Sequence, residues 1–217
     1  MSARDPRYVS VLRKDYRSSP QIMSTSSAVL YDSEMTFSGR YEADNSPLPP
    51  LQFLQVDGIV KLRVLGGVAS YVNVIEMRMV VQQVQSFYAA GLKPQEVGVF
   101  SPAVRQLQLI RDELVKINVP VPVIGHVDEF LGGEVIALVI SCVQSYSEWA
   151  KEPEDVVGFI GHPELSNFAI SRARRFVSIV GNLKFPHRED LFWRLFLRDS
   201  TRKGYLSLDM TLTMLDL

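Results

Sequence analysis

The segment HPELSNFAISRARRFVSIVGN, residues 162–182, combines the signals that decide the fold. Pro163 opens a short amphipathic helical stretch, because proline is favoured in the first turn of a helix. The apolar run RFVSIVG (175–181) follows and ends in glycine, which predicts a buried β-strand. A helix that leads directly into a buried strand is typical of an α/β sheet with helices on its faces.

Arg172, Arg174 and Arg175 lie between the helical stretch and the strand, and Arg188 follows a few residues later. A guanidinium group stays charged and donates paired hydrogen bonds to phosphate oxygens, so arginines at a sheet edge suit a phosphate site. The same residues also fit a solvated helix end, where cations interact favourably with the last carbonyl groups. The segment alone leaves both interpretations open.

The composition excludes a strong bulk electrostatic attraction to nucleic acid. The chain has 217 residues, 22% charged residues and a formal net charge of −1. This length fits one large domain with a substantial core. Any contact with nucleic acid must therefore come from a local cationic patch.

Cys142 is the single cysteine and lies in the apolar run VIALVISCV. It cannot form an internal disulfide, and we expect a buried side chain in a reducing compartment. The sequence MSARDPRYVS at the start has no apolar signal core, and no apolar run reaches the roughly 18 residues of a membrane span. These features predict a cytosolic or nuclear protein.

The first third of the chain has mixed patterns. Residues 1–35 predict a short strand or coil followed by a helix, and residues 38–50 predict an exposed loop rich in turn formers. LQFLQVDG (51–58) alternates as a strand does. The stretch from Val60 to Ser70, which contains Gly66 and Gly67, fits no single pattern.

The middle of the chain alternates between helices and buried strands. Asn73 caps a predicted long helix that Gly91 closes, and Ser101-Pro102 is the predicted cap and first turn of a second helix. The second helix carries an apolar stripe at Ala103, Leu107, Ile110, Leu114 and Ile117. Short apolar runs predict strands at 97–102, 121–125 and 135–143.

This alternation predicts one doubly wound α/β domain with a mainly parallel sheet. In such sheets, ligands bind at the carboxyl ends of the strands. Ser101-Pro102, Gly125-His126, Gln144 and Gly181-Asn182 follow predicted strands, so we expect these loops and the cationic motifs to share one edge. Residues 200–217 are too weakly patterned for an assignment.

Several chemistries are excluded by missing motifs. No GxxxxGK[ST] is present, so the chain is not a self-sufficient P-loop ATPase, and neither GxGxxG nor GxSxG occurs. Three histidines and one cysteine at wide spacing make a poor zinc set, and we predict no metal site. The acidic pair Asp128-Glu129 is a weak candidate for magnesium, because Gly125-His126 interrupts the strand before it.

Four motifs, LRKDYRSSPQI, FSPAVRQ, VDEFLGGE and NFAISRARR, occur in this order. Together they resemble the C-terminal, second RecA-like domain of superfamily 1 helicases of the Upf type, most closely the Armitage-type RNA helicases of RNA silencing. The resemblance runs from about Val9 to Tyr205. It implies a RecA-like doubly wound sheet with helices on both faces, formed by residues 1–199, and a C-terminal tail at 200–217.

The resemblance assigns five residues to a nucleotide. Arg172 corresponds to the arginine finger, and Arg17 faces the γ-phosphate. Tyr16 lies near the nucleotide, Gly132 permits close backbone approach, and Glu134 reaches the ribose. The implied cofactor is ATP with Mg2+, shared with a P-loop RecA-like domain supplied in cis or in trans.

The resemblance also implies an RNA side, with Ser101, Pro102, Gln106 and Asn167 as the contact residues. The implied partners are single-stranded RNA and small-RNA silencing proteins, and the implied location is cytoplasmic, including ribonucleoprotein granules. A final match, the helical motif LFWRLFL, places Trp193 in the core rather than on a stacking platform.

The family pattern is not met at every position. Ala103 replaces a tyrosine, Leu131 a glutamine, Gln144 an arginine, and Glu164-Leu165 an arginine pair. These departures favour a second hypothesis, in which the chain is a degenerate or truncated, non-catalytic paralogue that binds RNA or a protein. Under either hypothesis the chain is not catalytic alone, and the sequence fits both a natural short protein and part of a longer one.

Overall fold

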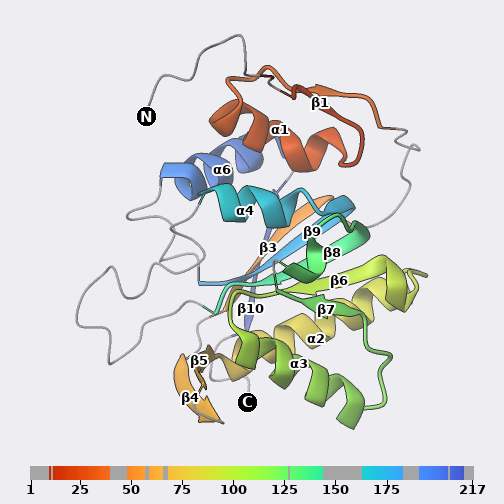
Figure 1. Cartoon of the computed structure of the whole chain (residues 1–217), viewed down its shortest axis with the longest axis vertical. Coiled ribbons are helices and arrows are strands. Elements are labelled where there is room, and N and C mark those ends of the chain that lie inside the picture. The colour runs from red at the N-terminus through yellow and green to blue at the C-terminus, as the bar shows by residue number, and fades with distance from the viewer. Residues whose placement is uncertain are drawn as a thin grey trace.

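The main sheet of the molecule has six strands that all run parallel (Figure 1). The computed structural model describes residues 10, 12–39, 48–56, 59–65, 68–126, 128–143, 163–182, 191–204 and 206–212. The strand order is β10-β3-β9-β8-β6-β7. The strands are β3 (Leu51–Val56), β6 (Val97–Phe100), β7 (Val123–Gly125), β8 (Val135–Ser141), β9 (Ala173–Gly181) and β10 (Leu206–Leu212).

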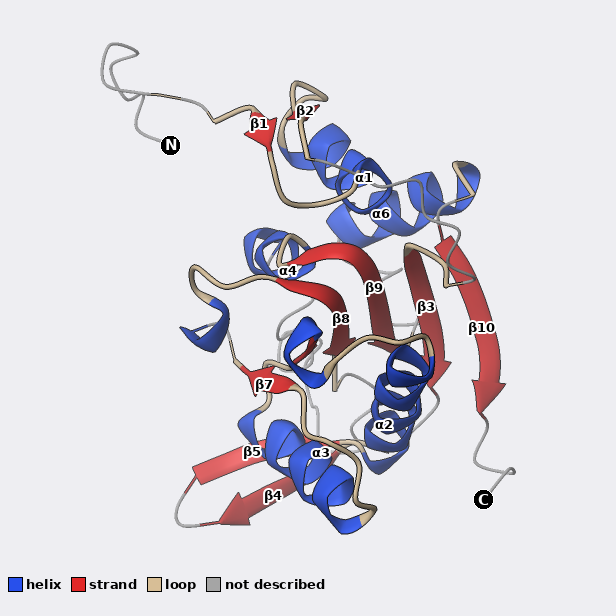
Figure 2. Cartoon of the chain, turned by 90° about the vertical axis from the view of Figure 1, so that its right-hand side faces the viewer, coloured by secondary structure: helices blue, strands red, loops and turns tan. Residues whose placement is uncertain are grey.

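Helices cover both faces of this sheet, as the sequence predicts (Figures 1 and 2). Helices α1 (Pro20–Leu30), α4 (Pro163–Ile170) and α6 (Leu191–Arg202) lie on one face. Helices α2 (Val74–Ala89) and α3 (Val104–Lys116) lie on the other. The predicted α/β fold with a parallel sheet is confirmed.

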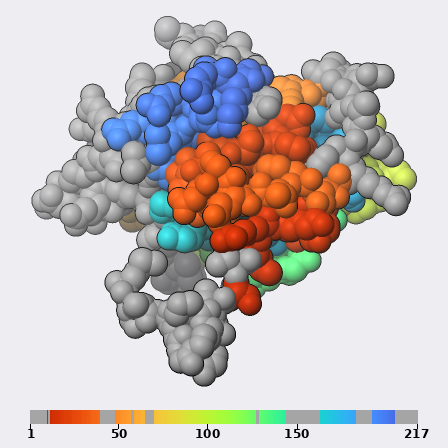
Figure 3. Space-filling model, turned by 90° about the horizontal axis from the view of Figure 1, so that it is seen from above, coloured from red at the N-terminus to blue at the C-terminus, as the bar shows by residue number. Residues whose placement is uncertain are grey.

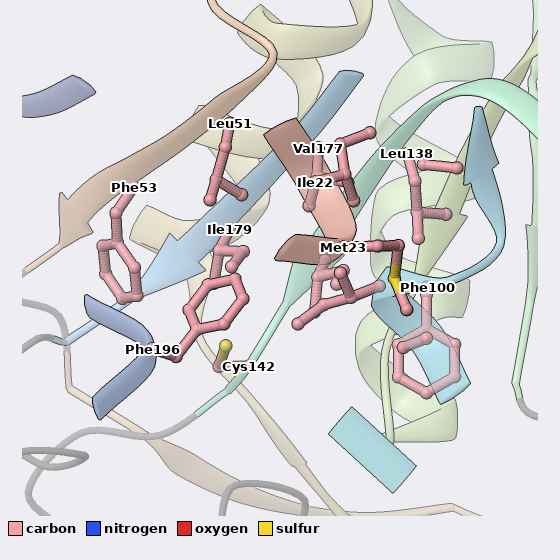
Figure 4. Close-up of a cluster of buried hydrophobic side chains, with 14 of the residues drawn as sticks. Ile22, Met23, Leu51, Phe53, Phe100, Leu138, Cys142, Val177, Ile179 and Phe196 are labelled. Carbon is pink, nitrogen blue, oxygen red and sulfur yellow. The ribbon is translucent and has the colours of Figure 1, made fainter. Parts of the chain in front are cut away.

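The sheet separates two hydrophobic cores, and β8 supplies both. Leu138 and Ile140 pack on the side of α1 and α6, whereas Ala137 and Val139 pack on the side of α2 and α3. This alternation explains the continuous apolar run, because a strand covered on both faces needs apolar side chains at every position. Figure 4 shows part of the first core, where Ile22, Met23 and Phe196 gather with residues of the strands.

Two predicted core residues are confirmed. Trp193 is fully buried in α6, and Cys142 is buried directly after β8. The Asn73 cap is also confirmed, since its side chain accepts hydrogen bonds from the backbone N–H groups of Ile75 and Glu76. Gly91 follows α2 with φ of +92°, a conformation that glycine adopts without strain.

The predicted cap of the second helix is wrong. Ala103 occupies the N-cap of α3 and provides no side-chain hydrogen bond. Ser101 lies two residues earlier, directly after β6, where its Oγ accepts a hydrogen bond from the N–H of Ala103 at 3.3 Å. The serine therefore closes the turn between strand and helix instead of capping the helix.

Other elements lie in stretches that the sequence-based prediction leaves ambiguous or unassigned. Strands β4 (Lys61–Leu65) and β5 (Val68–Val72) pair antiparallel in the stretch of ambiguous pattern, and β10 lies in the unassigned tail. Short strands β1 (Lys14–Asp15) and β2 (Thr36–Phe37) pair parallel beside α1. Two 3-10 turns, η2 (Pro94–Glu96) and η3 (Asp128–Phe130), complete the described elements.

Some predicted features fall outside the described residues. They are Gln144, the end of the predicted strand 51–58 and most of the predicted loop 38–50.

Because all six strands run parallel, the sheet has an amino edge, where the strands begin, and a carboxyl edge, where they end. In Figure 2 the arrows of β3 and β10 point from the side of α1 and β1 toward the side of the β4–β5 pair. The amino edge therefore lies near β1 and α1, and the carboxyl edge lies near β4 and β5.

Candidate functional site

The segment before α1 is tied to the amino edge of the sheet. The fully buried hydroxyl of Ser18 donates to the carbonyl of Ala173 at 2.8 Å, and the N–H of Ser19 donates to the carbonyl of Arg174 at 2.9 Å. The Asp15 carboxylate accepts the N–H groups of Arg17 and Ser18 at 2.7 and 3.1 Å. These bonds fix the backbone of Arg17 beside the first residue of β9.

Arg17 reaches across to the residue that precedes β8. Its Nε donates to Oε2 of Glu134 at 2.9 Å, and its Nη1 donates to the carbonyl of Ser171 at 3.1 Å. The other carboxylate oxygen, Oε1, lies 3.7 Å from Nη1 of Arg174. Glu134 therefore lies between two guanidinium groups that come from distant parts of the sequence.

Arg172 lies in the turn between α4 and β9, and its side chain contacts residues of that turn and of the end of α4. Its Nε donates to the carbonyl of Phe168 at 3.2 Å, and its Nη2 donates to Oγ of Ser171 at 3.0 Å. Its Cζ lies 4.4 Å from the centre of the Phe168 ring, a cation–π distance. The guanidinium is therefore oriented by neighbours within one helical turn.

The pKa of Arg172 is lowered from its ordinary value by burial first and then by the neighbouring Arg17 cation. Asp15 and Glu134 oppose this shift. Two cations therefore stand within electrostatic reach of each other. Such a pair suits an anion with several charges, which would relieve the repulsion between them.

The remaining residues predicted for a nucleotide lie in the same region. Figure 3 shows red atoms from the start of the described chain beside cyan atoms of α4 and green atoms from the middle of the chain. Tyr16 is 68% exposed, with Nζ of Lys14 at 5.1 Å from its ring centre. Gly132 has φ of +74° and nothing within 4 Å of an added Cβ, so its backbone faces open space.

The carboxyl edge holds a different kind of cluster, built around a fully buried acid. Oε2 of Glu76 accepts hydrogen bonds from Oγ of Ser141 at 2.9 Å and from the N–H of Val143 at 2.8 Å. The Nε2 of Gln106 donates to Oγ of Ser141 and to the carbonyl of Asn73, while its Oε1 accepts the N–H of Asn73. This cluster ties together the starts of α2 and α3 and the end of β8.

Val143 shows that this edge carries backbone strain. Its φ is +54°, which is a sterically unfavourable conformation for a β-branched residue. Its N–H is held by Glu76, so the buried acid maintains the strained turn. Cys142 lies in the same turn, and its pKa is raised well above the ordinary value by burial and then by the charge of Glu76.

The four residues predicted to contact RNA do not lie together. Ser101 and Gln106 are fully buried at the carboxyl edge, and Pro102 lies beside them and is partly buried. Asn167 lies on α4, across the sheet, where its Nδ2 donates to the hydroxyl of Tyr31 at 3.0 Å. Direct contact of these side chains with RNA stays a prediction. In the structure, the Gln106 side chain forms hydrogen bonds with Asn73 and Ser141 inside the protein.

The expectation that all these motifs share one edge is wrong. Arg172 and Glu134 precede their strands and lie at the amino edge, whereas Ser101 and Gln106 follow β6 and lie at the carboxyl edge. The segment 126–134 joins the two edges, since it leaves the end of β7 and returns to the start of β8. Within it, Phe130 packs edge-on against Phe100 with ring centres 6.3 Å apart.

Sequence reasoning missed Glu76, Ser141 and Ser18 as site residues. A signal existed for Glu76, because Asn73-x-x-Glu76 has the spacing of a capping box. No local pattern distinguishes Ser18 or Ser141, because the partners of their hydroxyl groups lie more than 30 residues away in the sequence. Among the described residues, no three His, Cys, Asp or Glu side chains are placed to hold a metal ion.

Comparison with known proteins identifies the family. A family model described as an AAA domain, AAA_12, matches residues 1–184. The chain belongs to this family, the C-terminal RecA-like domain of superfamily 1 Upf1-like helicases. Domains of this kind take part in ATP binding. No helix in the described ranges is long and apolar enough to cross a membrane.

Individual relatives include helicases of both RNA and DNA. The chain is 28% identical to the probable RNA helicase armi of Drosophila melanogaster, over 96% of this chain and 19% of that protein. It is 29% identical to the putative helicase MOV-10 of Gallus gallus, over 92% and 23%. It is also 29% identical to the 5'-3' DNA helicase ZGRF1 of Mus musculus, over 85% and 10%. The chain thus spans less than a quarter of each of these relatives.

One solved structure is similar in outline. It is the C-terminal domain of a possible DNA helicase from Lactobacillus plantarum WCFS1, with a TM-score of 0.49 and 12% sequence identity. The match covers 89% of this chain and 98% of that one.

Proposed function

We propose that this chain is the second motor domain of an ATP-dependent RNA helicase. In this proposal ATP and Mg2+ bind between the amino edge and a P-loop RecA-like domain, supplied in cis or in trans. The observation that carries the proposal is the convergence of Arg17, Arg172 and Glu134, which come from three separate segments. Family membership supports it independently.

Each residue of the amino edge has a role in this proposal. Arg172 donates to oxygens of the transferring phosphoryl group, and Arg17 donates to the γ-phosphate from the same side. Glu134 accepts a ribose hydroxyl group, and the exposed Tyr16 ring lies beside the nucleotide. The open backbone at Gly132 lets the nucleotide approach closely. The Mg2+ ligands and the P-loop lysine belong to the partner domain.

The repulsion between the two arginines explains the chemistry of this arrangement. Without an anion, Glu134 partly neutralises Arg17, while Arg172 is held by neutral oxygens and the Phe168 ring. Negative charge that builds up on a phosphoryl group would therefore be stabilised by a guanidinium already in position. An arginine finger of this kind contributes about 10³ to 10⁵ in rate in other nucleotide hydrolases.

The RNA preference and the RNA-silencing setting are part of the same proposal. Support comes from the motifs shared with Armitage-type helicases and from similarity to the probable RNA helicase armi. A competition between single-stranded RNA and single-stranded DNA of the same length would test the preference. Stronger binding of DNA would contradict it and would favour a role like the one that the name of ZGRF1 describes.

The decisive experiment joins this chain to a P-loop RecA-like domain and measures RNA-stimulated ATP hydrolysis. We expect Arg172→Ala to reduce the rate by about 10³ or more while the thermal unfolding midpoint stays unchanged. Arg198→Ala is the matched control, because it removes the same kind of side chain from α6, an element that the proposal does not place at the nucleotide. A variant with full activity, or equal losses in both variants, would refute the finger assignment.

The alternative is a non-catalytic RNA- or protein-binding module. It is favoured by Leu131, which is 63% exposed at the position where the family has a glutamine. In that case the joined protein would bind RNA without hydrolysing ATP, and Leu131→Gln would not restore hydrolysis.

A further inference from the structure

The β4–β5 hairpin lies beyond the carboxyl edge, between β3 and α2 in the sequence (Figures 1 and 2). It packs through β5 against α3, and the N–H of Arg105 donates to Oγ of Ser70 at 3.4 Å. Two strands alone are marginally stable in water, so this contact with α3 fixes the position of the hairpin.

The strand register sorts the hairpin side chains onto two faces. Residues directly opposite each other share a face, so Leu62, Val64 and Tyr71 lie on one side. Lys61 and Arg63 lie on the other side, where Arg63 is opposite Ser70. Because Ser70 contacts the start of α3, this second face is the one that α3 borders.

Two cations therefore lie on the face of the hairpin that α3 borders. We call Lys61 and Arg63 the cationic strip. Lys61 and Arg63 are exposed, and neither forms an ion pair with a carboxylate within the part of the chain that the structure describes. No Asp or Glu occurs anywhere in residues 59–75.

The hairpin cations differ from the arginines of the amino edge, which have Glu134 between them. Exposed Lys61 and Arg63 on a protruding ribbon suit a partner with regularly spaced negative charges, since counterion release favours such binding. The formal net charge of the whole chain is −1, so this attraction is local. It also supplies what the fully buried Ser101 and Gln106 do not, namely exposed charge at the carboxyl edge.

We propose that the cationic strip binds the phosphate backbone of single-stranded RNA where the strand passes the carboxyl edge. This inference rests on the proposed helicase function and adds a contact surface outside the four family motifs. The opposite face, with Leu62, Val64 and Tyr71, takes no part in it. A protein partner would use that apolar face instead, which makes the two possibilities separable.

The test measures binding of a fluorescein-labelled 15-nucleotide polyuridine RNA to the full chain by anisotropy, between 50 mM and 300 mM KCl. We expect the variant Lys61→Ala/Arg63→Ala to lower the slope of log affinity against log salt by about 1.4, or about 0.7 for each phosphate that is no longer neutralised. If the affinities converge at 1 M salt, that slope corresponds to about a 60-fold weaker affinity at 50 mM.

Two matched variants keep the test decisive. Arg194→Ala/Arg198→Ala removes two cations from α6, on the other face of the sheet, and should leave the slope unchanged. Lys61→Arg/Arg63→Lys keeps the charge of the strip and should retain the wild-type slope, which also shows that the hairpin tolerates substitution.

Several results would overturn the proposal. An unchanged slope in Lys61→Ala/Arg63→Ala is one, and an equal decrease in Leu62→Ser/Val64→Ser is another, because it would indicate the apolar face or a misfolded hairpin. No RNA binding by the wild-type chain at 50 mM KCl would also refute the strip. None of these results touches the Arg172 rate measurement, so failure of the strip is distinguishable from failure of the proposed function.

Discussion

The two edges of the sheet differ in how far their charged groups are buried and in what those groups contact. At the amino edge, Arg17 and Glu134 pair near the surface, and Arg172 contacts a phenylalanine ring, a carbonyl oxygen and a hydroxyl group. At the carboxyl edge, Glu76 is fully buried and accepts hydrogen bonds from a hydroxyl and a backbone N–H. The first edge leaves its charges near the surface, where the proposed nucleotide would contact them, whereas the buried acid of the second edge holds loops together.

This difference predicts that substitutions at one edge affect mainly activity and that substitutions at the other edge affect mainly stability. Partly exposed ion pairs contribute little to the free energy of unfolding, because water and salt screen them. A buried acid with several donors is different, because its removal leaves those donors without partners. Substitutions at the amino edge should therefore change activity with little loss of stability, and substitutions at the carboxyl edge should do the reverse.

The largest effect on stability is expected for Glu76→Ala. It removes the acceptor of the Ser141 hydroxyl and the Val143 N–H, and it leaves a cavity beside β8. The free energy of unfolding should fall by about 3 kcal/mol, from unsatisfied donors and the cavity together. Urea denaturation followed by circular dichroism measures this. Arg172→Ala is the comparison variant, and a similar decrease in both would erase the distinction between the edges.

A smaller effect is expected in the accessibility of Cys142. Burial raises the pKa of this thiol, and the charge of Glu76 raises it further, so the native protein should react slowly with a thiol reagent at pH 8. Glu76→Gln removes the second cause and weakens the hold on the Val143 turn. We expect the labelling rate to rise about tenfold, equivalent to about 1.4 kcal/mol of easier opening.

Because Cys142 is the single cysteine, the labelled site is unambiguous. Glu134→Gln is the matched control, since it makes the same chemical change at the amino edge. Equal labelling rates in wild type and Glu76→Gln would mean that the buried acid does not restrain this turn.

More of the fold than of the site is encoded in local sequence patterns. The apolar runs of β6, β8 and β9 and the Asn73 cap are such patterns, and the structure has them close to the predicted places. Strand β10 also has a local signal, because LSLDMTL alternates apolar and polar residues. The Gly-Gly pair between β4 and β5 is a further signal, typical of a hairpin.

The separation of the two edges is harder to predict. Arg172 stands before its strand and Ser101 after its own, so in a parallel sheet they belong to opposite edges. The order of motif and strand can be read from the sequence. However, the family motifs carry similar polar and cationic residues, and this similarity suggests one shared edge unless the direction of each strand is considered. The pairing of Arg17 with Glu134 spans 117 residues, and no periodic pattern encodes a contact at that distance.

A modest effect is expected for Gly132→Ala at the amino edge. The φ of +74° disfavours any residue with a Cβ, although the space around the added atom is open. The free energy of unfolding should fall by about 1 kcal/mol, from backbone conformation alone. Gly133→Ala is the control, because its φ is not positive and its nearest contact is at 3.7 Å. Equal decreases in both would show that the positive φ angle does not decide the cost.

The smallest effect is expected for the ion pair of Arg17 and Glu134. A double-mutant cycle with Arg17→Ala and Glu134→Ala should give a coupling of about 0.5 kcal/mol that declines in high salt, since the Glu134 side chain is 45% exposed. The exposed Arg13–Glu34 pair is a reference with similar geometry. A coupling above about 2 kcal/mol would mean that the pair is structural. A weak coupling means that Glu134 can exchange Arg17 for a ribose hydroxyl at little cost, as the proposed nucleotide site requires.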